Sequence, residues 1–146
     1  MKIRKSMVML ATVAAAMAPL LASPGIASAR IVHDATARNV SGSPDFQRCN
    51  HVYYHGDAGM ACFERYGDKF WVKDNLADGH HVATAAEVNG TDYFVCHDYS
   101  GKVAGWTVCD GFSSQIPEHV RMIWNVSVME GDTELAHGTM LGDETT

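Results

Sequence analysis

The stretch that decides the fold is Ala83-Thr84-Ala85-Ala86-Glu87-Val88-Asn89-Gly90-Thr91-Asp92-Tyr93-Phe94-Val95-Cys96-His97. Its two arms, 83–88 and 91–97, have strand-like composition and flank Asn89-Gly90, the strongest short-range signal of a β-hairpin. A second pair of arms, 61–66 and 69–73, flanks Gly67-Asp68, which suits a two-residue loop of type I′ or II′. Two hairpins within 37 residues predict an all-β fold.

The longest periodic segment follows Pro117. Its apolar side chains recur at every second position: Val120, Met122, Trp124, Val126 and Val128. This alternation predicts a half-buried strand, although a helical template also matches part of the segment. The β-branched content favours the strand. Gly131-Asp132 then turns the chain, and 134–140 is expected to return as a final strand.

Seven or eight short strands, with a turn about every ten residues, predict a single-domain antiparallel β-sandwich, with a small β-barrel as the alternative. We expect this domain to span 46–141. Residues 30–45 are polar and poor in large apolar side chains, which indicates an extended lead-in. Residues 142–146 are expected to be a frayed tail.

The four cysteines predict two disulfides. Cys49 and Cys62 enclose twelve residues, as do Cys96 and Cys109, and glycine lies near the middle of each loop. Four cysteines allow three connectivities, but symmetric turns at 54–57 and 101–104 would place each pair opposite one another across antiparallel strands. We therefore predict that the disulfides Cys49–Cys62 and Cys96–Cys109 staple the domain. A zinc or redox site would need close pairs such as C-x-x-C, and the sequence has none.

The first 29 residues have the pattern of an export signal. Basic residues at positions 2, 4 and 5 precede an apolar run over 8–22, and Ala27-Ser28-Ala29 is the small-x-small pattern that signal peptidase accepts. We predict a signal peptide over 1–29 that is cleaved after Ala29, and therefore a secreted, extracellular protein. The run is shorter than the ~20 residues that span a bilayer, so no membrane association is expected after signal removal.

The charge balance excludes two classes of partner. The chain of 146 residues carries 11 basic and 17 acidic side chains, and without residues 1–29 it has 117 residues with 8 and 17, a net charge of −9. Nucleic acids and anionic membranes require a basic face that releases counterions. Neither is expected as a partner.

No motif of metal or catalytic chemistry stands out. The eight histidines have no recurring ligand spacing, and the adjacent His80 and His81 should point to opposite faces of a strand. The segment 74–79 faintly resembles a calcium loop, but Leu76 and Ala85 occupy positions that need oxygen ligands, so we interpret it as a turn rich in Asx chemistry. We expect no metal, no cofactor and no catalytic residue.

The aromatic residues favour a binding function. Tyr53 and Tyr54 are neighbours, so one of them must face away from the surface on which the other packs. Trp71 has the opposite parity to Phe70 and Val72, and it is either exposed or covered by a second sheet. We predict a non-enzymatic interaction protein that binds an extracellular protein or carbohydrate through Tyr53, Tyr54 and Trp71. The alternative is a small secreted hydrolase or hydrolase inhibitor.

One segment carries a family resemblance: Cys62-Phe63-Glu64-Arg65-Tyr66-Gly67-Asp68-Lys69-Phe70-Trp71-Val72-Lys73-Asp74, continuing to Ala77-Asp78-Gly79-His80. It resembles small secreted proteins of uncharacterised function from Streptomyces and related actinobacteria, over roughly 49–129. Those proteins also have a later cysteine pair around a glycine-rich stretch, similar to 96–109 here. The resemblance implies a secreted bacterial β-protein and transfers no catalytic residue. The chain departs from the pattern at Ala104-Gly105-Trp106, where a glycine-threonine-tryptophan cluster is expected.

Overall fold

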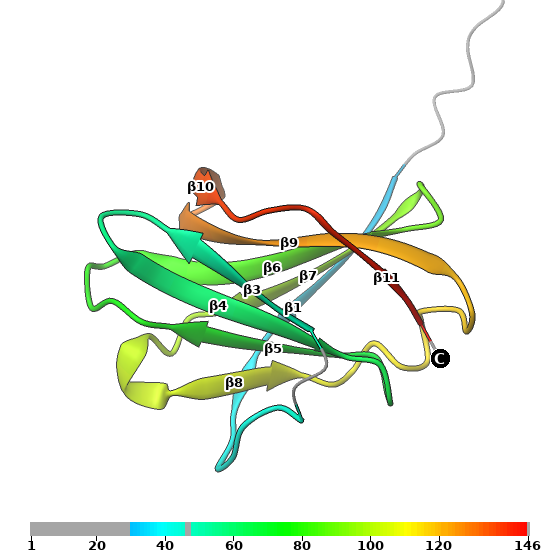
Figure 1. The fold of residues 1–146 in the computed structure, drawn as a ribbon, viewed down its shortest axis with the longest axis horizontal. Helices are drawn as coiled ribbons and strands as arrows, with labels where there is room; N and C mark the ends of the chain where they lie inside the picture. Colours follow the sequence, from blue (N-terminus) through cyan, green and yellow to red (C-terminus); the bar gives the residue numbers. More distant parts are fainter. Residues whose placement is uncertain (1–29, 46–47, 146) are drawn as a thin grey trace, which may run out of the picture.

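The chain forms two β-sheets that pack face to face (Figure 1). The computed structural model describes residues 30–45 and 48–145. The elements are β1 (Ile31–Thr36), β2 (Arg38–Asn39), β3 (Arg48–Tyr53), β4 (Asp57–Glu64), β5 (Lys69–Asp74), β6 (His81–Val88), β7 (Asp92–Asp98), the 3-10 turn η1 (Lys102–Ala104), β8 (Trp106–Cys109), β9 (Arg121–Glu130), β10 (Thr133–His137) and β11 (Leu141–Glu144).

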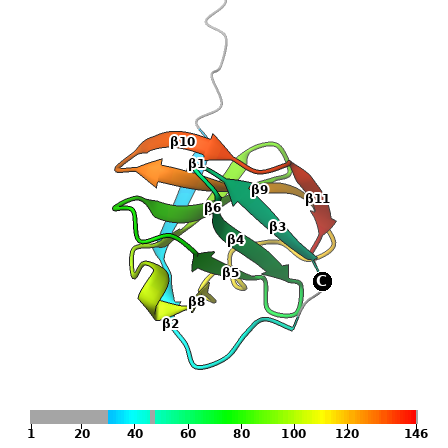
Figure 2. The same cartoon turned by 60° about the vertical axis from the view of Figure 1, so that its left-hand side comes forward.

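The two sheets are open, which confirms the predicted sandwich over the barrel alternative. One sheet has six strands in the order β1-β7-β6-β9-β10, with β11 also pairing with β9, and the other has five in the order β2-β8-β5-β4-β3. At one edge of the sandwich, β3 lies against β9 and β10 (Figure 2). Each strand therefore has one side chain row facing the other sheet and one row facing outward.

The hairpin predicted from Asn89-Gly90 is confirmed. β6 and β7 pair in an unbroken antiparallel register on either side of it. Asn89 and Gly90 have φ values of 52° and 74°. Positive φ at both central residues is what a type I′ turn requires, and its twist matches that of the flanking strands.

The predicted hairpin around Gly67-Asp68 is also present, as β4 and β5, but its turn is longer than expected. β4 ends at Glu64 and β5 begins at Lys69, and these two residues are register partners. The turn therefore has four residues, 65–68, and the Asp68 amide donates to the Arg65 carbonyl at 3.3 Å. Asp68, the last residue of this turn, is only 1% exposed.

β9 follows the predicted period of two and forms the centre of the core. Four of its alternate side chains are at most 1% exposed: Met122, Trp124, Val126 and Val128. Phe70 of the facing sheet lies among other aromatic rings, with centroids 5.1 Å from Phe63, 6.2 Å from Phe112 and 6.3 Å from Trp124. Each such buried side chain contributes about 1.5–3 kcal/mol to folding by leaving water. Packing between the sheets is the main source of stability.

Both predicted disulfides are present, but only one joins neighbouring antiparallel strands as expected. Cys49 and Cys62 are register partners on β3 and β4, with Cα atoms 4.0 Å apart. Cys96 and Cys109, with Cα atoms 6.0 Å apart, belong to different sheets, so the expectation of an antiparallel pair is wrong for them. The reason is that η1 carries the chain from β7 to β8 across the sandwich. The Cys96–Cys109 disulfide thus joins the two sheets through the core.

Both segments placed outside the predicted domain take part in the sheets. Residues 31–36, expected in a lead-in, form β1, which pairs with β7 in parallel, so the six-stranded sheet is not wholly antiparallel. As an edge strand β1 is mostly exposed, including its two large apolar side chains, Ile31 and Val32. The expected frayed tail is wrong, because residues 141–144 form β11. Arg65 holds this strand by donating to the Asp143 carboxylate at 2.8 Å and 2.5 Å.

The predicted signal peptide, with its cleavage after Ala29, lies outside the described residues. Within 30–45 and 48–145, no helix has the length and apolar character needed to cross a membrane.

Candidate functional site

The outer face of the five-stranded sheet carries the aromatic side chains that the sequence singled out. Trp71 on β5 has the opposite parity to Phe70 and Val72, which are fully buried in the core. Trp71 is half-buried and lies on the outer side, so the second sheet does not cover it. Its register partners on this side are Cys62 on β4 and Val108 on β8.

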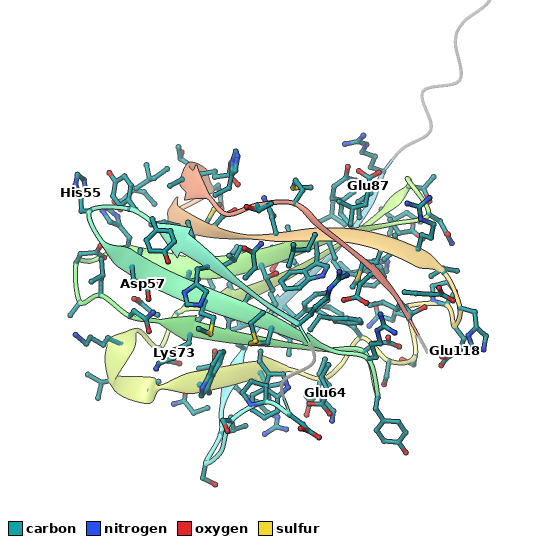
Figure 3. All side chains as sticks on the ribbon, in the orientation of Figure 1. His55, Asp57, Glu64, Lys73, Glu87 and Glu118 are labelled. Carbon is teal, nitrogen blue, oxygen red and sulfur yellow. A yellow bond between two sulfur atoms is a disulfide. The ribbon has the colours of Figure 1, made fainter. Side chains whose placement is uncertain are left out.

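The Trp71 ring is held in place by Glu64. Trp71 Nε1 donates to Glu64 Oε2 at 2.8 Å, and Lys69 Nζ pairs with Glu64 Oε1 at 2.8 Å. Glu64 lies at one end of β4 and Asp57 at its other end (Figure 3). The hydrogen bond satisfies the polar atom of the indole and leaves the ring as a preorganised apolar surface.

A second tryptophan, Trp106, lies on the same face and was not among the residues predicted to bind. It pairs with Lys73 of β5, whose Nζ lies 5.9 Å from the centroid of the Trp106 ring. Since Trp71 pairs with Val108, Trp71 and Trp106 are diagonal neighbours, a separation of roughly 7–8 Å across antiparallel strands. The alternation in 106–109 was the sequence signal that could have placed Trp106 on the outer side, because Trp106 and Val108 share one face of the strand and Thr107 and Cys109 the other.

The face continues to the edge strand β3. Met60 pairs with Lys73 on one side and with His51 on the other. The rings of His51 and Tyr53 are nearly parallel, with centroids 6.2 Å apart, and Tyr53 is 69% exposed. We call the outer residues His51, Tyr53, Met60, Trp71, Lys73 and Trp106 the aromatic face. Beside it is a surface hollow lined by His51, Tyr53, His137, Gly138 and Thr139.

The three residues predicted to bind do not lie on one surface. Tyr53 and Trp71 belong to the aromatic face, whereas Tyr54 turns inward and packs against the core. Its ring lies 4.3 Å from that of His55 and 5.6 Å from that of His80. Tyr54 is therefore a packing residue of the β3–β4 turn.

Two buried carboxylates, Asp74 and Asp98, bond to the loops at the end of the sandwich that carries the β3–β4 turn. Asp98 is fully buried and accepts hydrogen bonds from the amides of Asp74 at 3.3 Å and Ser100 at 3.0 Å. Asp74, which is 3% exposed, accepts from the Leu76 amide at 2.8 Å. Burial raises the pKa of both carboxyl groups. These contacts match the Asx turn predicted for this segment and leave the pair inaccessible to a substrate.

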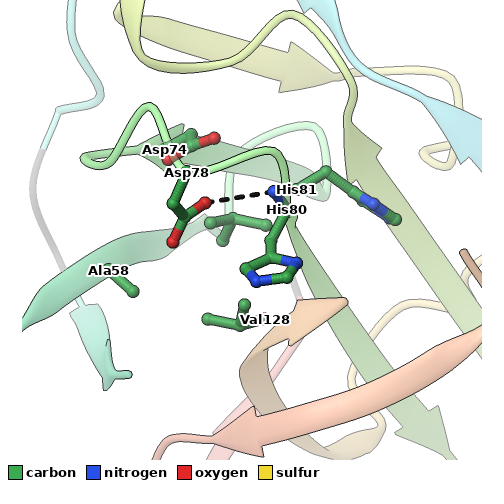
Figure 4. Close-up of a pocket in the computed structure, with 7 residues that line it drawn as sticks. Ala58, Asp74, Asp78, His80, His81 and Val128 are labelled. Carbon is green, nitrogen blue, oxygen red and sulfur yellow. Dashed lines mark hydrogen bonds between the residues drawn. The ribbon is translucent and has the colours of Figure 1, made fainter. Parts of the chain in front are cut away.

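A small recess near these loops gathers both acidic and histidine side chains (Figure 4). Its lining residues are Ala58, Asp74, Asp78, His80, His81, Val82 and Val128. Asp78 Oδ1 accepts from the His80 amide at 3.0 Å, a second Asx turn. The polar groups of the recess thus shape the chain between β5 and β6.

One serine, glutamate and histidine come together on the six-stranded sheet, but in the wrong order for nucleophilic catalysis. Ser127 Oγ donates to Glu134 Oε2 at 2.6 Å, and His137 Nδ1 lies 2.9 Å from Glu134 Oε1. The hydrogen bond from Ser127, followed by the contact with His137, lowers the pKa of Glu134. A catalytic triad places the histidine between the serine and the acid, so that it can take the serine proton. Here the carboxylate occupies the middle position, so Ser127 donates to Glu134 and not to His137.

Comparison with known proteins adds no relative. No protein-family model, no curated protein and no solved structure matches this chain.

Proposed function

We propose that this chain is a secreted, non-enzymatic binding protein whose aromatic face holds a neutral polysaccharide at the cell surface or in the medium. The observation that carries the proposal is the diagonal pair Trp71 and Trp106 on the outer face of a rigid sheet. Large, preorganised rings with satisfied polar atoms can stack on the apolar faces of sugar rings without a large cost in side-chain entropy.

The surroundings of the two rings support a sugar ligand. Lys73, Glu64 and His51 border the rings and can exchange hydrogen bonds with hydroxyl groups. Lys73 on the face and Glu64 beside it carry charges of opposite sign, which favours a neutral polymer over an anionic one. The export pattern of residues 1–29 and the two disulfides support action outside the cell.

Binding to insoluble neutral polysaccharides, measured by depletion of the protein from solution, tests the proposal. Cellulose, chitin and xylan are suitable probes. Trp106→Ala and Trp71→Ala are each expected to weaken binding at least about tenfold, the size of a hot-spot truncation. Tyr66→Ala is the matched control, because Tyr66 is 86% exposed but lies in the β4–β5 turn. Near-UV circular dichroism of each alanine variant checks that loss of binding is not loss of fold.

Two outcomes contradict the proposal. One is that the wild-type protein binds none of these polysaccharides, which would favour a protein partner. The other is that binding occurs but Trp71→Ala and Trp106→Ala bind as well as Tyr66→Ala.

A further inference from the structure

His81 and His97 meet on the outer face of the six-stranded sheet, on the opposite side of the sandwich from the aromatic face. His81 Nε2 lies 3.0 Å from His97 Nδ1. The β6–β7 register pairs Ala83 with His97, so His81 is the diagonal neighbour of His97 on one face. The ring of His81 points away from that of His80, as expected for consecutive residues entering a strand (Figure 4).

The other nitrogen of His97 faces an acid. His97 Nε2 lies 3.4 Å from Asp34 Oδ1 on the neighbouring strand β1, and the His97 side chain is only 9% exposed. A metal-binding histidine commonly directs its second ring N–H to a carboxylate, which fixes the tautomer and makes the first nitrogen a better ligand. With its proton on Nε2 toward Asp34, His97 presents the lone pair of Nδ1 to His81.

We propose that His81 and His97 bind one borderline divalent metal ion, Zn²⁺ or Cu²⁺, with Asp34 as the outer partner of His97. Two nitrogens bound to a tetrahedral ion at about 2.0–2.1 Å stand about 3.3–3.4 Å apart. The two rings therefore need to separate by only a few tenths of an ångström and rotate toward solvent. Imidazole nitrogen suits both ions, and Cu²⁺ binds such ligands more tightly than Zn²⁺.

Water completes the coordination. Among the residues that the structure describes, no group of three or more His, Cys, Asp or Glu side chains is placed to hold a metal. Two protein nitrogens leave at least two positions for solvent, which is an open site rather than a closed structural one.

The surroundings of His81 favour a cation, because the negative charges of Glu130 and Asp132 act on this side chain. The exposed ring of Tyr99 packs beside both histidines, with its centroid 4.4 Å from that of His81 and 5.2 Å from that of His97.

Titration with each metal alone tests the site. With Zn²⁺, two-bond ¹H–¹⁵N correlation spectra should show the ring nitrogens of His81 and His97 shifting together and reaching completion at one equivalent. With Cu²⁺, electron paramagnetic resonance should show coupling to two nitrogens. His81→Gln should weaken binding of both ions at least about tenfold, and Asp34→Asn by about 10–100-fold. His137→Gln, an exposed histidine variant on the same sheet, should bind like the wild type.

The proposal is overturned if the ring nitrogens of His81 and His97 do not move at equimolar Zn²⁺ and Cu²⁺ shows no coupling to two nitrogens. It is also overturned if His81→Gln binds both ions as tightly as His137→Gln. Near-UV circular dichroism identifies a misfolded variant, and the wild-type spectra decide the question without any substitution.

Discussion

Asp68 is expected to make this protein less stable at neutral pH than at mildly acidic pH. Its side chain is buried in the β4–β5 turn, and Oδ1 has no hydrogen-bond partner among the described residues. Burial, followed by the nearby negative charge of Glu118, raises the pKa of Asp68 from 3.8 to about 6. Ionising Asp68 therefore costs free energy in the folded state that it does not cost in the unfolded chain.

The sign and size of the effect follow from proton linkage. Between pH 4 and 6 the folded protein binds a proton at Asp68 that the unfolded chain has already lost, so stability falls as the pH rises through this window. A shift of about two pKa units corresponds to a loss of roughly 2–3 kcal/mol, complete above about pH 7. Asp68→Asn has the same shape, carries no charge and tolerates the φ of 44° at this position. We expect it to raise the free energy of unfolding by about 2 kcal/mol at pH 7.5 and to leave it nearly unchanged at pH 4.

Urea denaturation of the wild type and Asp68→Asn at half-unit steps from pH 4 to pH 8 measures this difference directly. Asp132→Asn, in the exposed β9–β10 turn, is the matched control and should track the wild type at every pH. The predicted result is a stability gain of Asp68→Asn over the wild type that is larger at pH 7.5 than at pH 4. The reasoning is refuted if this gain is the same at both pH values or smaller at pH 7.5.

Three further predictions concern the packing of the sheets. Replacing Cys96 and Cys109 together by alanine should lower the free energy of unfolding by about 3 kcal/mol in non-reducing urea denaturation. The disulfide joins residues 13 positions apart, and its loss frees that loop in the unfolded chain. An unchanged midpoint would contradict this. Gly59→Ala should lower the free energy of unfolding by about 1–3 kcal/mol by overpacking, because the added Cβ would lie 2.5 Å from Val82 Cγ2 of the facing sheet. A stability equal to that of the wild type would show that the sheets can move apart. Asp143→Ala should lower the free energy of unfolding by about 1–2 kcal/mol, a modest loss because its partners Arg48 and Arg65 are partly exposed. It should also increase hydrogen exchange in β11. Unchanged protection of β11 would mean that backbone pairing alone holds the strand.

Local signals predicted the strands more reliably than the path between them. Asn89-Gly90 requires positive φ at both residues, and the alternation from Val120 to Val128 requires one buried side, so both features follow from single-residue chemistry. The chain between Cys96 and Cys109 has the same spacing as a hairpin, but η1 takes it into the other sheet. That choice depends on tertiary packing, which a spacing rule does not contain.

The edges of the sandwich were harder to predict for a related reason. β1 and β11 bury little apolar surface, so neither shows the alternation of apolar and polar side chains that identifies a half-buried strand. β11 is held by backbone pairing with β9 and by the ion pairs of Asp143, and neither leaves an apolar pattern in the sequence.

In the candidate sites too, local pattern predicted some positions, whereas others depended on tertiary packing. Parity separated Trp71 from Phe70 and Val72 but left open whether a second sheet covers it, and Tyr54 could not be separated from Tyr53 before the turn geometry was known. Extending the register of the Asn89-Gly90 hairpin brings His81 next to His97, a proximity that counting residues between histidines does not reveal.

The central claim, that the aromatic face holds a neutral polysaccharide, is tested most directly by the indole N–H resonances of the chain's three tryptophans. In a titration with a soluble oligosaccharide of whichever polysaccharide retains the protein, the resonances of Trp71 and Trp106 should shift together and saturate. Trp124, which is fully buried in the core, should stay in place and serves as the internal control. Unchanged Trp71 and Trp106 resonances at saturating oligosaccharide, or a shift of Trp124 as large as theirs, would contradict the claim.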